Sequence, residues 1–247
     1  YELTNNSQGI AACMNHLGAI YENWQDYKSA LNSYNTALDL EKHNKNFGGI
    51  ANTLNNLGNL LNKMGHFDEA LNKYEQALEI RKKEDNLKGI ASTLNNIGTI
   101  YTKKRNYEVA RQHYVEALKI SKKINSDYET TVNLYAIGNN YLTLQKYLSA
   151  KKYFEESLII ATNNNLRELI SDNYKALAEV YSKLKLFDKA YYSLEQYMIL
   201  KDSIFSKETH KQMTEVKTRY ETEKKQKEIE LLKRNFLIQQ LESDKRE

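Results

Sequence analysis

The sequence predicts an all-α fold, a solenoid of about five helix hairpins followed by a long C-terminal helix. Five stretches overlie one another at a spacing of 40 residues without a gap, and small residues recur at two places in each stretch. The first set is Gly18, Gly58, Gly98, Gly138 and Ala178, and the second is Ala30, Ala70, Ala110, Ala150 and Ala190. Similarity at a fixed period indicates stacked repeats that each contact only their neighbours.

Each repeat is expected to form two amphipathic helices. In the second repeat, the apolar residues of 54–61 and 71–78 follow a helical rhythm, and residues 63–66 form a turn between them. Gly58 and Ala70 are expected where the two helices face each other, because helix axes approach within about 8–10 Å only where side chains are small.

The order of residues in these hairpins resembles the tetratricopeptide repeat. The second repeat carries Leu54, Leu57-Gly58, Leu61, Ala70, Tyr74 and Ala77, and the third carries Leu94, Ile97-Gly98, Tyr101, Ala110, Tyr114 and Ala117. The resemblance implies a right-handed α-solenoid over residues 1–203, with units near 7–46, 47–86, 87–126, 127–165 and 166–203. Because the family's usual unit has about 34 residues, the longer period implies longer helices, as in variants that hold extended peptides.

Composition and charge exclude several classes of function. No apolar run approaches the ~18 residues of a membrane span, so we expect no membrane contact by this chain itself. The net charge of +4 is spread along the chain, which disfavours nucleic-acid binding.

The sequence predicts no catalytic residue, metal site or cofactor. Its five histidines fall in different repeats or turns, and it has no glycine-rich phosphate loop. We assign Gly48, Gly49 and Gly89 to chain reversals between repeats. Cys13, the single cysteine, has apolar neighbours and is expected to be a buried, inert thiol.

A row of asparagines marks the first helix of the second repeat. Asn52, Asn55, Asn59 and Asn62 are spaced 3, 4 and 3 residues apart, which confines them to an arc of about 80°. In the tetratricopeptide family, the first helix of each pair lines the concave wall, so the resemblance implies a peptide-binding groove at these and the equivalent positions. The predicted groove residues are Asn15, Asn52, Asn55, Asn59, Asn62, Ser92, Asn95, Thr99, Thr102, Tyr135, Asn139 and Lys175.

A carboxamide both donates and accepts hydrogen bonds, so this wall suits the backbone of an extended peptide or protein segment. Four asparagines in one helix forgo about 2 kcal/mol of helix propensity, which calls for a reason. The alternative is compositional drift, since asparagine is also frequent in the loops. A carboxylate clamp of the chaperone-adaptor type is not expected, because Asn15, Asn55 and Asn95 stand where that subfamily has lysine.

Residues 204–247 are expected to form one charged helix that acts as a cap or a coiled coil. The segment from 207 onward lacks glycine and proline, and a short stripe of Met213, Val216 and Tyr220 suits packing on the last repeat. A second set predicts a partner surface, either in a homodimer or with residues beyond the last one: Ile229, Leu232, Phe236, Ile238 and Leu241.

The segments 200–205, 220–225 and 228–232 resemble the junction of bacterial tetratricopeptide sensor proteins. That resemblance implies an extracytoplasmic, ligand-sensing or scaffolding region of a membrane-anchored signal-transduction protein. Its output would be a histidine kinase or a transcriptional regulator. The alternative is a free-standing cytoplasmic adaptor whose last helix caps the stack. Residues 1–10 match 41–50, as though an earlier repeat preceded them.

Overall fold

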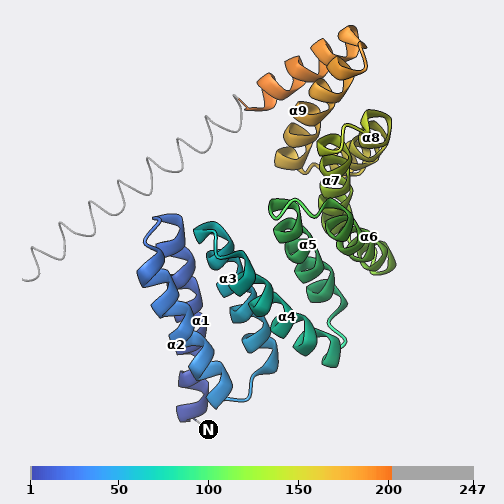
Figure 1. Cartoon of the computed structure of the whole chain (residues 1–247). Coiled ribbons are helices and arrows are strands. Elements are labelled where there is room, and N and C mark those ends of the chain that lie inside the picture. The colour runs from blue at the N-terminus through green and yellow to red at the C-terminus, as the bar shows by residue number, and fades with distance from the viewer. Residues whose placement is uncertain (1, 202–247) are drawn as a thin grey trace, which may run out of the picture. The chain divides into compact units, whose positions relative to one another are not determined.

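The computed structural model describes residues 2–201, with side chains from residue 7 onward, and every regular element in that range is a helix. Figure 1 shows these helices pairing in consecutive hairpins, so the predicted all-α solenoid is confirmed. The helices are α1 (Glu2–Asn23), α2 (Tyr27–His43), α3 (Phe47–Met64), α4 (Phe67–Lys83), α5 (Leu87–Lys103), α6 (Tyr107–Lys123), α7 (Asp127–Thr143), α8 (Tyr147–Asn163) and α9 (Arg167–Lys183), followed by a helix over residues 187–201.

The chain divides into two units, Tyr1–Glu195 and Gln196–Glu247, and the hairpin array belongs to the first. The predicted cap and partner surface of the C-terminal helix lie outside the described residues: Met213, Val216, Tyr220, Ile229, Leu232, Phe236, Ile238 and Leu241.

The same short turn follows each of the helices α1 to α9. After α2, the Asn46 amide donates to the Glu41 carbonyl at 3.0 Å and the Lys45 amide to the Lys42 carbonyl at 3.1 Å, as in a Schellman motif. Asn46 then caps the next helix by accepting from the amide of Gly49. The left-handed residues of these turns recur every 20 residues: Gln25, Lys45, Gly65, Asp85, Arg105, Asn125, Gln145, Asn165 and Lys185. Turns within and between repeats therefore share one backbone geometry.

Glycine allows the two helices of a hairpin to approach, but its partner is not the predicted one. A Cβ on Gly58 would lie 2.5 Å from the ring of Tyr74, so the contact is glycine against an aromatic ring and not glycine against Ala70. Gly18, Gly98 and Gly138 meet a ring in the same way. The fifth repeat replaces both partners, with Ala178 for the glycine and Leu194 for the ring.

The core is a chain of local clusters. One cluster joins residues of α2, α3 and α4, and the next joins α3, α4 and α5. The odd-numbered helices also contact one another in sequence, α1 with α3, then α5, α7 and α9, whereas no two of the even-numbered helices α2 to α8 do so. The odd-numbered helices therefore form one continuous wall, here called the inner face.

The assignment of Gly48, Gly49 and Gly89 to chain reversals is wrong, because all three lie in the first turn of a helix, α3 or α5. Gly49 and Gly89 each face a long side chain from the end of the preceding helix. A Cβ on Gly89 would come within 2.8 Å of Arg81 Cδ, and one on Gly49 would overlap the Glu41 carboxylate. These glycines make room for buried side chains, since Glu41 and Arg81 are each only 5% exposed.

The expectation of a buried Cys13 is also wrong, because this thiol is exposed. The same register position in later repeats holds Thr53, Thr93, Asn133 and Asn173, all of them buried. Thr53 and Asn133 hydrogen-bond to the preceding odd-numbered helix. Cys13 makes no such contact with another odd-numbered helix in the part of the chain that is described, and it is exposed.

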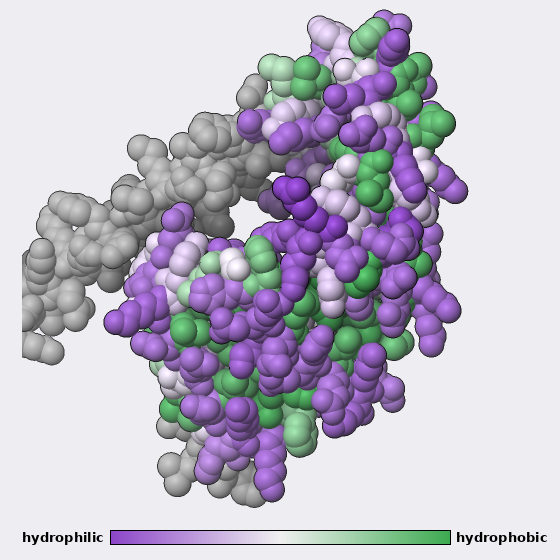
Figure 2. All heavy atoms as spheres, in the orientation of Figure 1, coloured by the Kyte–Doolittle hydropathy of each residue, from purple (hydrophilic) through white to green (hydrophobic). Residues whose placement is uncertain are grey.

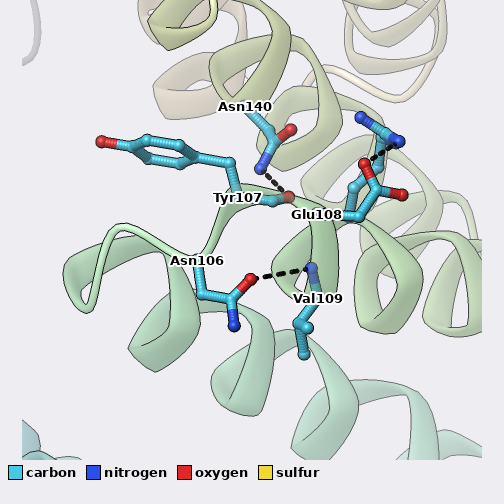
Figure 3. A network of polar contacts seen from close by, with 6 residues as sticks. Asn106, Tyr107, Glu108, Val109 and Asn140 are labelled. Carbon is cyan, nitrogen blue, oxygen red and sulfur yellow. Dashed lines mark hydrogen bonds and ion pairs between the residues drawn. The ribbon is translucent and has the colours of Figure 1, made fainter.

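A buried asparagine joins the third hairpin to the fourth. Asn140 of α7 donates from Nδ2 to the carbonyl of Tyr107, the first residue of α6, at 2.8 Å (Figure 3). The equivalent residues Leu60, Ile100 and Val180 are apolar and fully buried, and the Oδ1 atom of Asn140 has no hydrogen-bond partner among the described residues. This junction therefore contains a polar group where its neighbours have hydrocarbon.

Candidate functional site

The predicted groove residues all lie on the odd-numbered helices and so on the inner face. Asn15 is on α1, Asn52 to Asn62 on α3, Ser92 to Thr102 on α5, Tyr135 and Asn139 on α7, and Lys175 on α9. What the sequence did not show is how many of these side chains bond to one another or to neighbouring repeats.

One set of contacts joins residues 41 positions apart. Asn96 Nδ2 donates to Asn55 Oδ1 at 3.1 Å, and Lys103 Nζ donates to Asn62 Oδ1 at 2.7 Å. Two ion pairs repeat the step, Lys63 with Glu22 at 2.6 Å and Lys88 with Glu129 at 3.4 Å. These contacts fix the register of each odd-numbered helix against the next from α1 to α7.

A second set joins residues 38 positions apart. Asn15 Nδ2 donates to Thr53 Oγ1 at 2.8 Å, and Asn95 Nδ2 donates to Asn133 Oδ1 at 2.7 Å. Asn55 and Thr93 are the equivalent pair at the intervening junction, that of α3 with α5. There the side chain of Arg81 lies between the two residues.

Arg81 projects from α4 into the junction of α3 and α5. Its guanidinium donates to Asn52 Oδ1 at 3.0 Å, to the Gly89 carbonyl at 2.9 Å and to Thr93. Asn55 Oδ1 lies at 3.5 Å, the limit of a hydrogen bond. Burial lowers the pKa of Arg81, yet several oxygens face its charge. Such contacts to a charged donor are the stronger class of hydrogen bond.

The remaining predicted residues make contacts within their own repeats. Tyr74 donates to Asn59 Oδ1 at 2.7 Å, while Thr99 and Thr102 lie beside the Tyr114 hydroxyl at 3.4 and 3.1 Å. Tyr135 packs against the ring of Phe154. Burial raises the pKa of Tyr135, and a hydrogen bond with Asn139 partly offsets that rise. Lys175 is exposed on α9.

These bonds orient the asparagine row of α3. The Oδ1 atoms of Asn52, Asn55, Asn59 and Asn62 each accept a hydrogen bond from the protein, whereas their Nδ2 groups donate none among the described residues. On α5 the pattern is reversed, because Asn95 and Asn96 donate from Nδ2 and their oxygens accept no bond in that range. The inner face therefore offers donors on α3, from Asn52, Asn59 and Asn62, and acceptors on α5, whereas Asn55 is only 9% exposed.

The inner face is hollowed between α5 and α7. The hollow is lined by Ala91, Ser92, Asn95, Asn96, Tyr128, Glu129, Val132 and Asn133. Of the predicted groove residues it includes Ser92 and Asn95. Sequence reasoning missed Tyr128, which is 57% exposed at the rim, because it occupies the position of Gly48 and Lys88 in earlier repeats.

Glu129 gives this hollow a negative charge. Burial alone would raise its pKa, but hydrogen bonding from Ser126 and the charge of Lys88 bring the pKa below its ordinary value. The carboxylate is therefore ionised at neutral pH, and Lys88 balances it from α5. An exposed ring, a charged pair and several amides are groups that recognise peptides.

The described residues contain no group of three or more His, Cys, Asp or Glu side chains placed to hold a metal ion. None of the helices described is both long enough and apolar enough to cross a membrane.

Comparison with protein families identifies the tetratricopeptide repeat over residues 49–123, and again over residues 11–44 and 133–164. Together these segments cover more than half of the chain. No curated protein matches it.

Several solved structures share the fold. BtubC (BKLC) from P. vanneervenii aligns with a TM-score of 0.71 at 20% identity, over 80% of this chain and 82% of that one. A Rap protein complexed with Competence and Sporulation Factor aligns with a TM-score of 0.68 at 19% identity, over 76% of this chain and 52% of that one. PH0952 from Pyrococcus horikoshii, a Signal Transduction ATPase with Numerous Domains protein with a tetratricopeptide repeat sensor, aligns with a TM-score of 0.68 at 18% identity, over 78% of this chain and 30% of that one.

Proposed function

Since this chain belongs to the tetratricopeptide repeat family, a family of protein-interaction modules, we propose that its inner face binds an extended peptide or protein segment across α3, α5 and α7. The observation that carries the proposal is the opposite orientation of the amides on neighbouring helices. Nδ2 groups on α3 that donate no bond within the described range match peptide carbonyls, and amide oxygens on α5 that accept none there match peptide N–H groups.

The hollow between α5 and α7 gives this surface a place for a side chain. Tyr128 would cover that side chain with its ring, and Lys88 and Glu129 lie at 3.4 Å from each other beside it. Backbone pairing supplies affinity and the hollow supplies selectivity, which is how extended segments are recognised in general.

We further propose that the module is the ligand-sensing or scaffolding region of a bacterial signal-transduction protein. The resemblance of its C-terminal segments to sensor junctions supports this role. So do the fold relatives, since one was solved with Competence and Sporulation Factor and another is described as a sensor. Binding at the inner face would bridge odd-numbered helices of different repeats and so alter the pitch of the array.

Short random peptides displayed on phage, selected on the full chain, test the binding proposal. We expect the selection to yield peptides that bind the wild type. Their affinity for the Tyr128→Ala variant should be about tenfold lower, or about 1.4 kcal/mol, because the exposed Tyr128 ring covers the hollow. Leu148→Ala is the matched control, since Leu148 of α8 is also a large exposed side chain, at 73%, and lies outside the hollow. Equal losses in both variants, or none in either, would contradict the proposal.

Asn55 and Asn95 are unsuitable for this test. Both bond to a neighbouring repeat, so replacing them would weaken the stack as well as any ligand contact.

A further inference from the structure

Aromatic rings stack between the two helices of the third hairpin and of the fourth. Tyr101 of α5 stacks on His113 of α6, with ring centroids 5.5 Å apart and planes within 8°. One repeat later, Tyr141 of α7 stacks on Tyr153 of α8 at 5.5 Å and 16°. In each case the second ring comes from the position twelve residues after the first.

The last repeat keeps the first ring and lacks the second. Tyr181 of α9 continues the series, but Ser193 stands where His113 and Tyr153 supply a ring. Ser193 is only 3% exposed, so its small side chain faces the interior of the array. The final stacking position is therefore left without its ring.

A hollow of about 480 Å³ lies at this place, between α8, α9 and the helix that begins at Phe187. It is lined by Glu155, Leu158, Ile159, Tyr174, Leu177, Tyr181, Lys189, Tyr192 and Ser193. This volume is within the range of about 300–1,000 Å³ typical of ligand sites. The hollow shares no residue with the one between α5 and α7.

The lining suits an aromatic ring. Tyr174 and Tyr192 meet edge to face at 6.3 Å and 80°, and Leu177 supplies a hydrocarbon surface. Aromatic pairs in such geometries are favoured by about 0.5–1.5 kcal/mol beyond the burial of their area. Several hydrophobic side chains are exposed at this end of the array, including Phe187 and Leu186. Figure 2 shows hydrophobic surface among the polar surface at the top of the view.

Polar groups at the hollow are held in place. Tyr181 donates to Glu155 at 2.7 Å, and Lys189 Nζ lies 5.8 Å from the centre of the Tyr181 ring. A carboxylate and an ammonium beside an apolar floor match the N–H and C=O groups that flank a side chain in a peptide.

We propose that this hollow is a second binding site, which takes an aromatic side chain from a peptide segment of a partner protein. The entering ring occupies the place that His113 and Tyr153 fill from within the chain in the two preceding repeats. The third and fourth repeats thus show a side-chain chemistry that completes the stack.

NMR titration of the full chain with N-acetyl-tryptophanamide, and with N-acetyl-leucinamide for comparison, tests this proposal. We expect saturable shifts of Leu177 and Tyr192 with the aromatic amide and binding at least about tenfold weaker for the leucine amide. Equal binding of the two amides, or shifts elsewhere only, would overturn the proposal.

Ser193→Tyr provides the decisive variant, because it restores the ring found at Tyr153. It should weaken binding of the aromatic amide at least about tenfold and leave the unfolding midpoint equal or higher. Tyr191→Ala is the control on the same helix, since Tyr191 is 71% exposed and outside the lining, and it should bind as the wild type does.

Unchanged binding by a folded Ser193→Tyr variant would overturn the proposal. If that variant is destabilised, binding of the aromatic amide is measured on Tyr192→Ala instead. Unchanged binding by Tyr192→Ala would equally overturn the proposal. Binding of phage-selected peptides at the α5–α7 hollow should be unaffected by Ser193→Tyr, so the two sites succeed or fail separately.

Discussion

Replacing Gly89 by alanine should destabilise the array, although glycine to alanine normally stabilises a helix by about 0.5–1 kcal/mol. The added Cβ would lie 2.8 Å from both Cδ and Nε of Arg81. Arg81 has little freedom to move away, because it is 5% exposed and its guanidinium bonds to Asn52, Thr93 and the Gly89 carbonyl.

The expected size follows from two opposing terms. Overpacking a tight interior costs about 1–3 kcal/mol, which exceeds the usual gain from alanine. We therefore expect a net loss of about 1–2 kcal/mol, measured as the urea midpoint by circular dichroism. Gly48→Ala is the matched control in the first turn of α3, since its nearest non-local atom would be Glu84 Oε2 at 3.7 Å, and it should be stabilising.

A double-mutant cycle isolates the contact. In an Arg81→Ala background the obstructing side chain is absent, so Gly89→Ala should recover its ordinary stabilising sign. The reasoning is refuted if Gly89→Ala stabilises the wild type, or if it costs the same in both backgrounds.

The remaining predictions concern the turns, a buried amide and alkaline pH. Lys45→Gly should raise the free energy of unfolding by about 0.5–1 kcal/mol, because Lys45 has φ 53°, and an unchanged urea midpoint would contradict this. Asn140→Val should also raise the midpoint, since it removes an unpaired buried Oδ1 at a position that is otherwise apolar, and a lower midpoint would show that the bond to the Tyr107 carbonyl dominates. Burial, with Glu22 nearby, raises the pKa of Tyr34 and Tyr74. A tyrosine in the unfolded chain has a pKa of about 10. The free energy of unfolding that the two neutral, buried tyrosines contribute is therefore complete below that pH and should fall as the pH rises above it. Urea midpoints measured across that range check this, and a flat profile would exclude it.

Periodicity alone predicted the hairpins, because a ring meets a glycine in four repeats and both recur at fixed spacing. The spacing predicted that Asn52 and Asn55 lie on one side of a helix, but a one-dimensional pattern does not show what a side chain contacts. Arg81 belongs to α4, outside the row of predicted groove residues, so its bonds to Asn52 and Thr93 had no sequence signal.

The cost of the asparagine row was read from the sequence as a reason to expect a ligand. The structure shows a structural role for these asparagines, since Asn55 and Asn62 accept hydrogen bonds from the next odd-numbered helix. The error over Gly49 and Gly89 has a similar origin. Glycine in a short connection and glycine beneath a long side chain look alike until the opposing residue is known, and here Glu41 and Arg81 are eight positions earlier.

The central claim is that a peptide segment binds along the inner face. Hydrogen–deuterium exchange of the full chain, with and without the tightest phage-selected peptide, tests it most directly. We expect slower amide exchange in α5 and α7 when the peptide is bound, together with slower exchange in α3. Protection confined to the even-numbered helices, with the peptide at saturation, would contradict it.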